Sequence, residues 1–315
     1  NTDDGDIIII AADYYDINQL SKTFLNSDKA NKLLKRIKIE STDSIRARYI
    51  GNKKLLDPLF SSSKIKIATD YYPHLSYEAG KSLFLQDNAK NLTSIHNFPV
   101  PINQILMNNY PSNTLNISNE SHFLKSKNII IAKEILKDFT NERRFVNRLY
   151  SQQLRYSLKL LSSQLFQCQA EHLNNKIDNR LIVDSAFQLV TATTPYLGKN
   201  DLVKLWKEIQ NSPCYKNLPI KTVNLLALHK EIATHNFNKA LKISKHILQN
   251  ERLSNSHELN EYIFATALIS AIKTNNIKLA INIWNTLFPM LYTKQKEVPM
   301  SLRLLLAHLN TYRLH

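Results

Sequence analysis

The sequence predicts an all-α protein whose C-terminal part, residues 121–315, is a stack of antiparallel helix pairs. Three observations lead to this prediction: scarce glycine, helical periodicity from about residue 121 onward, and a repeat of about 40 residues. Only four of the 315 residues are glycine, where average usage of about 7% would give roughly twenty. Phosphate-binding loops and tight β-hairpins need glycine, so an α/β nucleotide enzyme and an all-β sandwich are disfavoured.

The chain is strongly basic, with 41 Lys and Arg against 26 Asp and Glu and a formal net charge of +15. Its two cysteines, Cys168 and Cys214, show no Cys-x-x-Cys spacing, which suggests neither a disulfide framework nor a zinc site and favours a reducing compartment. The longest apolar run, 7–12, is far shorter than the roughly 18 residues needed to cross a bilayer, so we expect a soluble protein. Because the chain begins at Asn1 rather than Met, we expect that any targeting presequence has been removed.

Residues 1–120 predict an irregular, partly helical basic region. The segment 28–66 holds eleven Lys and Arg against four acids, a local net charge of +7. A Pro- and Asn-rich stretch near 97–118 follows it. Because proline disfavours helix at its own and the preceding position, this stretch is predicted to be a linker.

From about residue 121 the apolar residues recur at helical spacing. Ile129, Ile135 and Phe139 belong to one stripe. A leucine stripe that includes Leu158 and Leu165 predicts a long helix from about 141 to 173.

The repeat follows this long helix. Residues 235–248 align without gaps on 275–288, and residues 198–209 align on 236–247. Small alanines recur where helices approach, and bulky residues recur in the seam. A helix pair cannot bury both of its faces alone, so stacked pairs are the physical interpretation. The predicted pairs lie near 181–210, 220–249 and 259–292.

These pairs resemble pentatricopeptide repeats, the helical-hairpin family of organelle RNA-binding proteins. The family's first-helix pattern is approximated by Ala265–Ile269. Its second-helix pattern is approximated by Leu202–Ile209, Ala240–Ile247 and Ala280–Leu287. The resemblance covers roughly 110 residues at spacings of 38 and 40, and tetratricopeptide arrays fit a similar pattern.

The resemblance implies a right-handed superhelix of helix pairs and a fungal mitochondrial protein. It also implies that a polar residue near the start of each first helix reads an RNA base. The matching position is Thr266 in one repeat and Leu226 in the repeat before it. Because a leucine cannot hydrogen-bond a base edge, we expect RNA contacts through shape and phosphates.

Two basic surfaces are the candidate RNA contacts. Along the predicted helix at 141–173, cations at spacings of 4, 7 and 4 would share one side and could span phosphates, with a tyrosine beside them to stack a base. The alternative is a solvated face, as on any amphipathic helix. The N-terminal segment could be an RNA-binding arm or an ordinary basic surface. The candidates are Arg144, Arg148, Arg155, Lys159, Tyr156, Lys35, Arg36, Arg46, Arg48, Lys53, Lys54 and Thr266.

The sequence therefore favours a non-enzymatic RNA-binding factor of mitochondrial gene expression, in the matrix, acting in mRNA stability, processing or translation. Association with the ribosome is one option for such a factor. We expect no catalytic residue, no metal and no cofactor. The partners would be mitochondrial mRNA or rRNA, together with a protein of the expression machinery. The alternative is a scaffold whose repeat groove binds a ribosomal protein or the organelle RNA polymerase.

Overall fold

The computed structural model describes residues 28–36, 39, 41–62, 94–117, 124–168, 178–250, 256–292 and 297–312. These residues form helices joined by turns and contain no strand, which confirms the all-α prediction. The chain forms two compact units. Unit 1 comprises 1–97, 116–127 and 298–315, and unit 2 comprises 98–115 and 128–297. The expected domain boundary near residue 120 stays a prediction.

Unit 1 is built around its C-terminal helix. The helices that contribute to it are α2 (Asp28–Arg36), α3 (Thr42–Arg48), α4 (Lys53–Ser62), η2 (Ser94–Asn97), the first turn of α8 (Leu124–Lys137) and α16 (Met300–Thr311). The α16 helix packs on α4 and η2. The His308 ring Nε2 lies 2.7 Å from the Leu55 carbonyl, and the Ser301 hydroxyl donates to the Ile95 carbonyl at 3.1 Å. These bonds satisfy polar groups at the contact and fix the register of α16.

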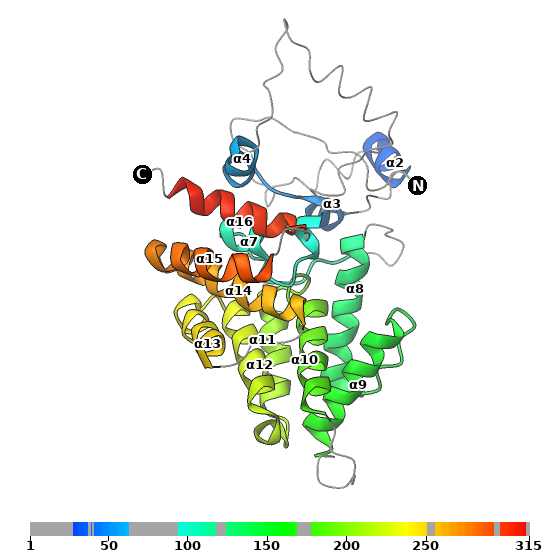
Figure 1. Cartoon of the computed structure of the whole chain (residues 1–315). Helices are drawn as coiled ribbons and strands as arrows, with labels where there is room; N and C mark the ends of the chain where they lie inside the picture. Colours follow the sequence, from blue (N-terminus) through cyan, green and yellow to red (C-terminus); the bar gives the residue numbers. More distant parts are fainter. Residues whose placement is uncertain are drawn as a thin grey trace, which may run out of the picture. The chain divides into compact units, whose positions relative to one another are not determined.

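Unit 2 contains the three helix pairs at the predicted places. Its elements are α7 (Ile102–Leu106), the rest of α8, the π-helical turn η3 (Asp138–Glu142), α9 (Gln152–Phe166), α10 (Asn179–Thr193), α11 (Lys199–Gln210), η5 (Tyr215–Asn217), α12 (Ile220–Ala233), α13 (Phe237–Asn250), α14 (His257–Lys273) and α15 (Ile277–Leu291). Consecutive helices pack from α12 to α15, and α10 contacts both α9 and α12 (Figure 1).

The core of the pairs consists of small and apolar residues. Ala240 of α13 and Ala280 of α15 have no exposed surface, and they stand at equivalent positions 40 residues apart. The α14 helix packs between α13 and α15, and it is apolar on nearly all sides, with Tyr262 and Phe264 fully buried. A helix that is apolar all round belongs in a protein interior.

The second and third pairs turn through the same motif without glycine. His235 and Asn275 adopt left-handed backbone, with φ of 59° and 56°. The amides of Asn236 and Asn276 each donate to the carbonyl five residues earlier, at 2.8 Å in both turns. This is the Schellman arrangement that ends a helix, and asparagine tolerates its left-handed position better than most residues other than glycine. The turn accounts for how the repeat forms with so little glycine.

The Pro- and Asn-rich segment, predicted as a linker, belongs to unit 2 over residues 98–115 and packs against the start of α11. The amides of Lys199 and Asn200 donate to the carbonyls of Pro111 and Ser112, both at 2.9 Å. The Gly198 amide donates to the Thr114 hydroxyl at 2.8 Å. The first amides of a helix have no partner inside the helix, so this segment supplies partners for the start of α11. Proline and asparagine are suited to that extended path, which the sequence pattern alone does not distinguish from a free linker.

Gly198 is required by this close approach. Its φ is an ordinary −72°, so any residue could adopt its backbone. A Cβ at residue 198, however, would lie only 2.7 Å from the Asn113 Cα, with other backbone atoms of residues 113 and 114 nearer still. Backbone cannot swing aside as a long side chain does, so the segment and α11 could not meet with a larger residue here.

The single long helix predicted at 141–173 is wrong. Helix α8 ends in the π-helical turn η3, whose Arg143 amide donates to the Asp138 carbonyl at 2.6 Å. Arg143 and Phe145 then adopt left-handed backbone, and α9 begins only after Ser151, whose hydroxyl accepts from the Leu154 amide. The leucine stripe is real over α9. The interruption before it depends on tertiary contacts that periodicity does not record.

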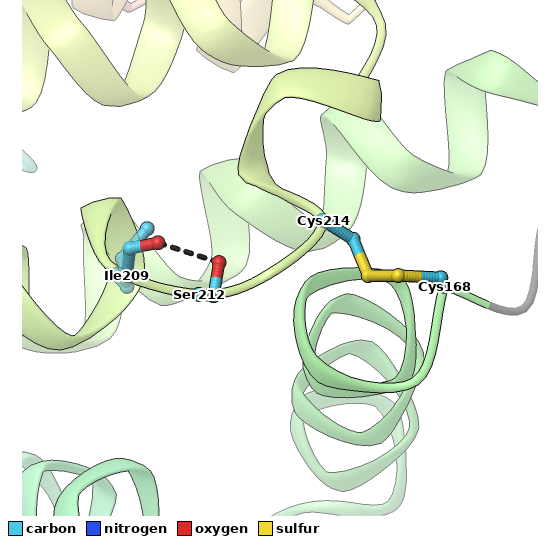
Figure 2. Close-up of a disulfide and its surroundings, with 4 residues drawn as sticks. All are labelled: Cys168, Ile209, Ser212 and Cys214. Atoms are coloured by element: carbon cyan, nitrogen blue, oxygen red, sulfur yellow. Dashed lines mark hydrogen bonds between the residues drawn. A yellow bond between two sulfur atoms is a disulfide. The ribbon is translucent and has the colours of Figure 1, made fainter.

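A disulfide that the cysteine spacing did not suggest joins the end of α9 to the turn after α11. Cys168 and Cys214 are bonded, with their Cα atoms 5.4 Å apart (Figure 2). The Cys214 amide also donates to the Leu165 carbonyl at 3.1 Å, and the Ser212 hydroxyl donates to the Ile209 carbonyl in the turn that leads to Cys214. The two cysteines meet because α9 and the turn after α11 converge, which no local motif encodes.

We expect Gly198→Ala to destabilise unit 2 by roughly 2–3 kcal/mol, because the added methyl overpacks against fixed backbone. Urea denaturation followed by circular dichroism measures the loss. Lys199→Ala, at the neighbouring exposed position, serves as the control and should change stability by less than about 0.5 kcal/mol. Equal effects of the two substitutions would contradict the close-approach argument.

Reducing the disulfide should lower the free energy of unfolding by about 4 kcal/mol on the chain-entropy estimate for a 46-residue separation. The comparison is urea unfolding with and without a phosphine reductant. The Cys168→Ala/Cys214→Ala variant should match the reduced protein and should not respond to the reductant. A wild-type protein that is equally insensitive to reductant would show that the bond contributes nothing.

Candidate nucleic-acid interface

The predicted RNA-binding residues between 144 and 159 lie on two kinds of backbone. Arg144 and Arg148 belong to the irregular segment before α9, whereas Tyr156 and Lys159 lie on α9 itself. All four side chains are exposed. The expected single-helix stripe therefore does not exist, but four of its members still face solvent.

Arg155 has a different role from the one predicted. Its side chain is half-buried, and its Nη2 donates to the Asn147 carbonyl at 3.0 Å and to the Tyr150 carbonyl at 3.5 Å. These bonds attach the irregular segment to the first turns of α9. Arg148 lies between the two bonded carbonyls, so Arg155 places it beside the helix. Tyr156 and Lys159, three residues apart, share one face of α9.

Further contacts hold the irregular segment in place. The Asn147 side-chain amide donates to the Glu134 carboxylate at 3.0 Å, and the Tyr150 hydroxyl donates to the Asp138 carboxylate at 2.8 Å. Burial, together with that bond, raises the pKa of Tyr150 above its usual range, so the phenol keeps its proton. The exposed cations therefore extend from an anchored segment, which lowers the entropy lost when a ligand is bound.

Two aliphatic side chains are exposed among the cations. Val146 is 62% exposed and Leu149 52% exposed, close to the 61% of Tyr156. We call Arg144, Val146, Arg148, Leu149, Tyr156 and Lys159 the α9 cluster. Its cations can neutralise phosphates and its tyrosine can stack on a base, while its aliphatic groups offer an apolar contact of modest size.

The predicted residues of unit 1 vary in exposure. Arg36, Lys53 and Lys54 are exposed, and Arg48 is half-buried. Arg46 pairs with Asp43 at 3.0 Å. The side chain of Lys35 lies outside the described residues.

Thr266 has no exposed surface, and neither has Leu226, the matching residue of the preceding pair. A buried hydroxyl cannot meet a base edge in this conformation. The structure thus offers no base-reading side chain at the position that the repeat resemblance implies.

A basic surface that motif reasoning missed lies on the second helix pair. Residues 220–250 hold five lysines and one acid, a net charge of +4. The pair before it, residues 178–210, has four cations and four acids, and the pair after it, residues 257–291, has two of each. Counting charge helix pair by helix pair would have found this surface.

Unit 1 contains a buried pair of basic side chains. Lys125 Nζ lies 3.2 Å from His96 Nδ1, and both residues are buried. Burial lowers the pKa of Lys125 to about 8. The pKa of His96 falls well below its ordinary value through burial and the neighbouring Lys125 charge. The Nδ1 of a neutral imidazole can then accept a hydrogen bond from the amine.

The described part of the chain offers neither a metal site nor a membrane span. No three His, Cys, Asp or Glu side chains there are placed to hold a metal ion. None of its helices is both long and apolar enough to span a membrane. Comparison with known proteins identifies no matching family, curated protein or solved structure.

Lys125 gives a stability prediction with a defined pH window. Its pKa is about 8 when folded and about 10.4 when unfolded, so between these values the unfolded chain binds more protons and stability rises with pH. Below pH 8 the burial cost is fully present. We expect Lys125→Met to stabilise the protein at pH 7 by on the order of 3 kcal/mol and to flatten stability between pH 8 and 9.5.

Urea unfolding at several pH values tests this expectation. Lys127→Met, at an exposed position two residues away, is the control and should leave the pH dependence unchanged. A Lys125→Met protein that is less stable at pH 7, with the wild-type slope above pH 8, would show that the amine is stabilising.

Proposed function

We propose that this protein is a non-enzymatic RNA-binding factor of mitochondrial gene expression, acting in mRNA stability, processing or translation. The proposal takes the three helix pairs of unit 2 as a right-handed superhelical stack of the pentatricopeptide kind. The basic net charge of +15 supports a polyanionic ligand. The mitochondrial assignment rests on the sequence resemblance alone.

The α9 cluster is the observation that carries the RNA-binding proposal. Arg144, Arg148 and Lys159 are exposed cations, and Tyr156 is an exposed aromatic, around a segment anchored by Arg155. This combination suits single-stranded RNA, whose phosphates meet the cations and whose unstacked bases can lie on the tyrosine ring. Because Thr266 is buried, recognition would rest on phosphates and stacking rather than on one base per repeat.

We expect Arg144→Ala/Arg148→Ala to weaken binding of a fluorescein-labelled 30-nucleotide single-stranded RNA roughly tenfold at 100 mM salt. The slope of log K against log salt should become less steep by about 1.4, because each lost phosphate contact removes about 0.7 for a single strand. Tyr156→Ala should weaken binding with little change in that slope. Fluorescence anisotropy provides all of these measurements.

The control for this experiment is Arg180→Ala/Lys278→Ala, which removes the same charge from exposed positions of unit 2 outside the cluster. It should retain nearly the wild-type affinity. If wild-type protein shows no salt-dependent binding below micromolar concentration, the proposed function is wrong.

A scaffold function is the second candidate, and Val146 and Leu149 are the observation that favours it. Exposed aliphatic side chains beside arginine and tyrosine are typical of protein interfaces, and they add little to phosphate binding. If Val146→Asp/Leu149→Asp abolishes binding to a purified ribosomal protein or to the organelle RNA polymerase while RNA affinity is unchanged, the scaffold would be favoured.

A further inference from the structure

The charge on the second helix pair has no counterpart on its neighbours. The α12–α13 pair has a net charge of +4, whereas the pairs on either side have net charges of zero. The α14–α15 pair packs together as α12–α13 does, and both belong to one unit with α10 and α11. The imbalance is therefore not a requirement of the helix pair itself.

The α13 helix presents its cations on the side opposite its packed face. Ala240, Ser244 and Ile247 are buried at helical spacing, and this face meets the neighbouring helices. Lys239 and Lys242 are exposed, three residues apart, which corresponds to a rise of about 4.5 Å along the axis. Two side chains at that spacing can contact neighbouring phosphates of one strand.

Two further exposed polar groups extend this face. His246 is exposed one turn beyond Lys242, and Lys221 is exposed in the first turn of α12. Because α12 and α13 are antiparallel and joined by a short turn, the start of α12 lies near the end of α13. Lys221 therefore lies at the same end of the pair as His246. Lys245 is half-buried on the same helix.

No exposed carboxylate compensates these charges within the pair. Its single acid, Glu231, is only 8% exposed. Lys230 lies with its Nζ 5.7 Å from the Trp206 ring centroid, so that lysine already faces an aromatic ring within the protein. Like charges at helical spacing repel and weaken a helix by a few tenths of a kcal/mol per pair. No exposed carboxylate of the pair offsets that repulsion. A bound polyanion would offset it.

We propose that the exposed face of α13, together with the first turn of α12, is a second phosphate-binding surface for single-stranded RNA. Its residues are Lys221, Lys239, Lys242 and Lys245, and we call this the α13 face. The inference rests on the proposed function for the identity of the polyanion. Binding is electrostatic and independent of sequence, because the face presents lysines and no exposed aromatic ring.

The side chains of the α13 face favour a nucleic-acid backbone over a lipid surface. Asn238 and Gln249, the other exposed residues of α13, are polar. None of the exposed large apolar side chains of the described residues belongs to α13, and the first turn of α12 has a single one, Ile220. Peripheral helices that bind membranes insert an apolar face below the headgroups, and the apolar face of α13 is occupied by packing.

The test is a pair of triple variants with equal net charge. Lys239→Gln/Lys242→Gln/Lys245→Gln removes the three lysines of the α13 face that lie on α13 itself. Lys199→Gln/Lys204→Gln/Lys207→Gln removes three exposed lysines from α11, a helix that also carries Asp201 and Glu208. Circular dichroism and thermal unfolding establish that both variants fold. The probe is the labelled 30-nucleotide RNA, titrated from 50 to 300 mM salt.

We expect the α13 variant to make the salt slope less steep by about 2, from three contacts at about 0.7 each, and to weaken binding more than tenfold at 100 mM salt. The α11 variant should change affinity less than threefold. Equal weakening by the two variants would mean that net charge alone acts, and would overturn the inference.

Separate outcomes distinguish this inference from the proposed function. The Arg144→Ala/Arg148→Ala variant could bind RNA like wild type while the α13 variant shows the less steep salt dependence. That result would support RNA binding by the α13 face and contradict RNA binding by the α9 cluster. If wild type binds phosphatidylserine vesicles or an acidic peptide but not RNA, both the inference and the proposed function are overturned.

Discussion

The contact between the 98–115 segment and the start of α11 is the constraint on which unit 2 depends. At Gly198 two backbones meet with no room for a Cβ. The amides of the first turn of α11 find their acceptors in Pro111, Ser112 and Thr114. The Tyr110 hydroxyl adds a bond to the Thr194 carbonyl at 2.9 Å. The first helix pair is thereby closed by chain from more than 80 residues earlier, which a repeat considered alone does not require.

Local and long-range contacts differ in how far the sequence predicts them. The helix pairs were predictable because their determinants are local: apolar periodicity, buried alanines, and turns in which His235 or Asn275 takes the left-handed position. The break before α9, the packing of the proline-rich segment and the disulfide were not predictable, because each depends on side-chain and backbone contacts that no local pattern encodes. The Tyr150–Asp138 bond holds backbone out of a helix that the leucine stripe would otherwise continue.

In the candidate site, too, the sequence pattern predicts some features of the residues and not others. Exposure of Arg144, Arg148, Tyr156 and Lys159 agrees with the polar side of the sequence pattern, although two of them are not helical. Arg155 belongs to the same run of charges, yet it binds two carbonyls of its own chain. A guanidinium with planar donors can hold a loop or bind a phosphate. Sequence spacing does not record which acceptor lies nearer.

Stacked helix pairs separate the residues that stabilise the fold from those free to meet a ligand. In α13 the packed positions are small or apolar, and the stack depends on these. The opposite positions contribute little to stability, so their charge can change without disturbing the fold. The second pair carries a net charge of +4 between two pairs of zero net charge, and of its five lysines Lys230 lies near an aromatic ring within the protein. If the α13 face binds RNA, as proposed, its exposed lysines serve the ligand and not the packing of the stack.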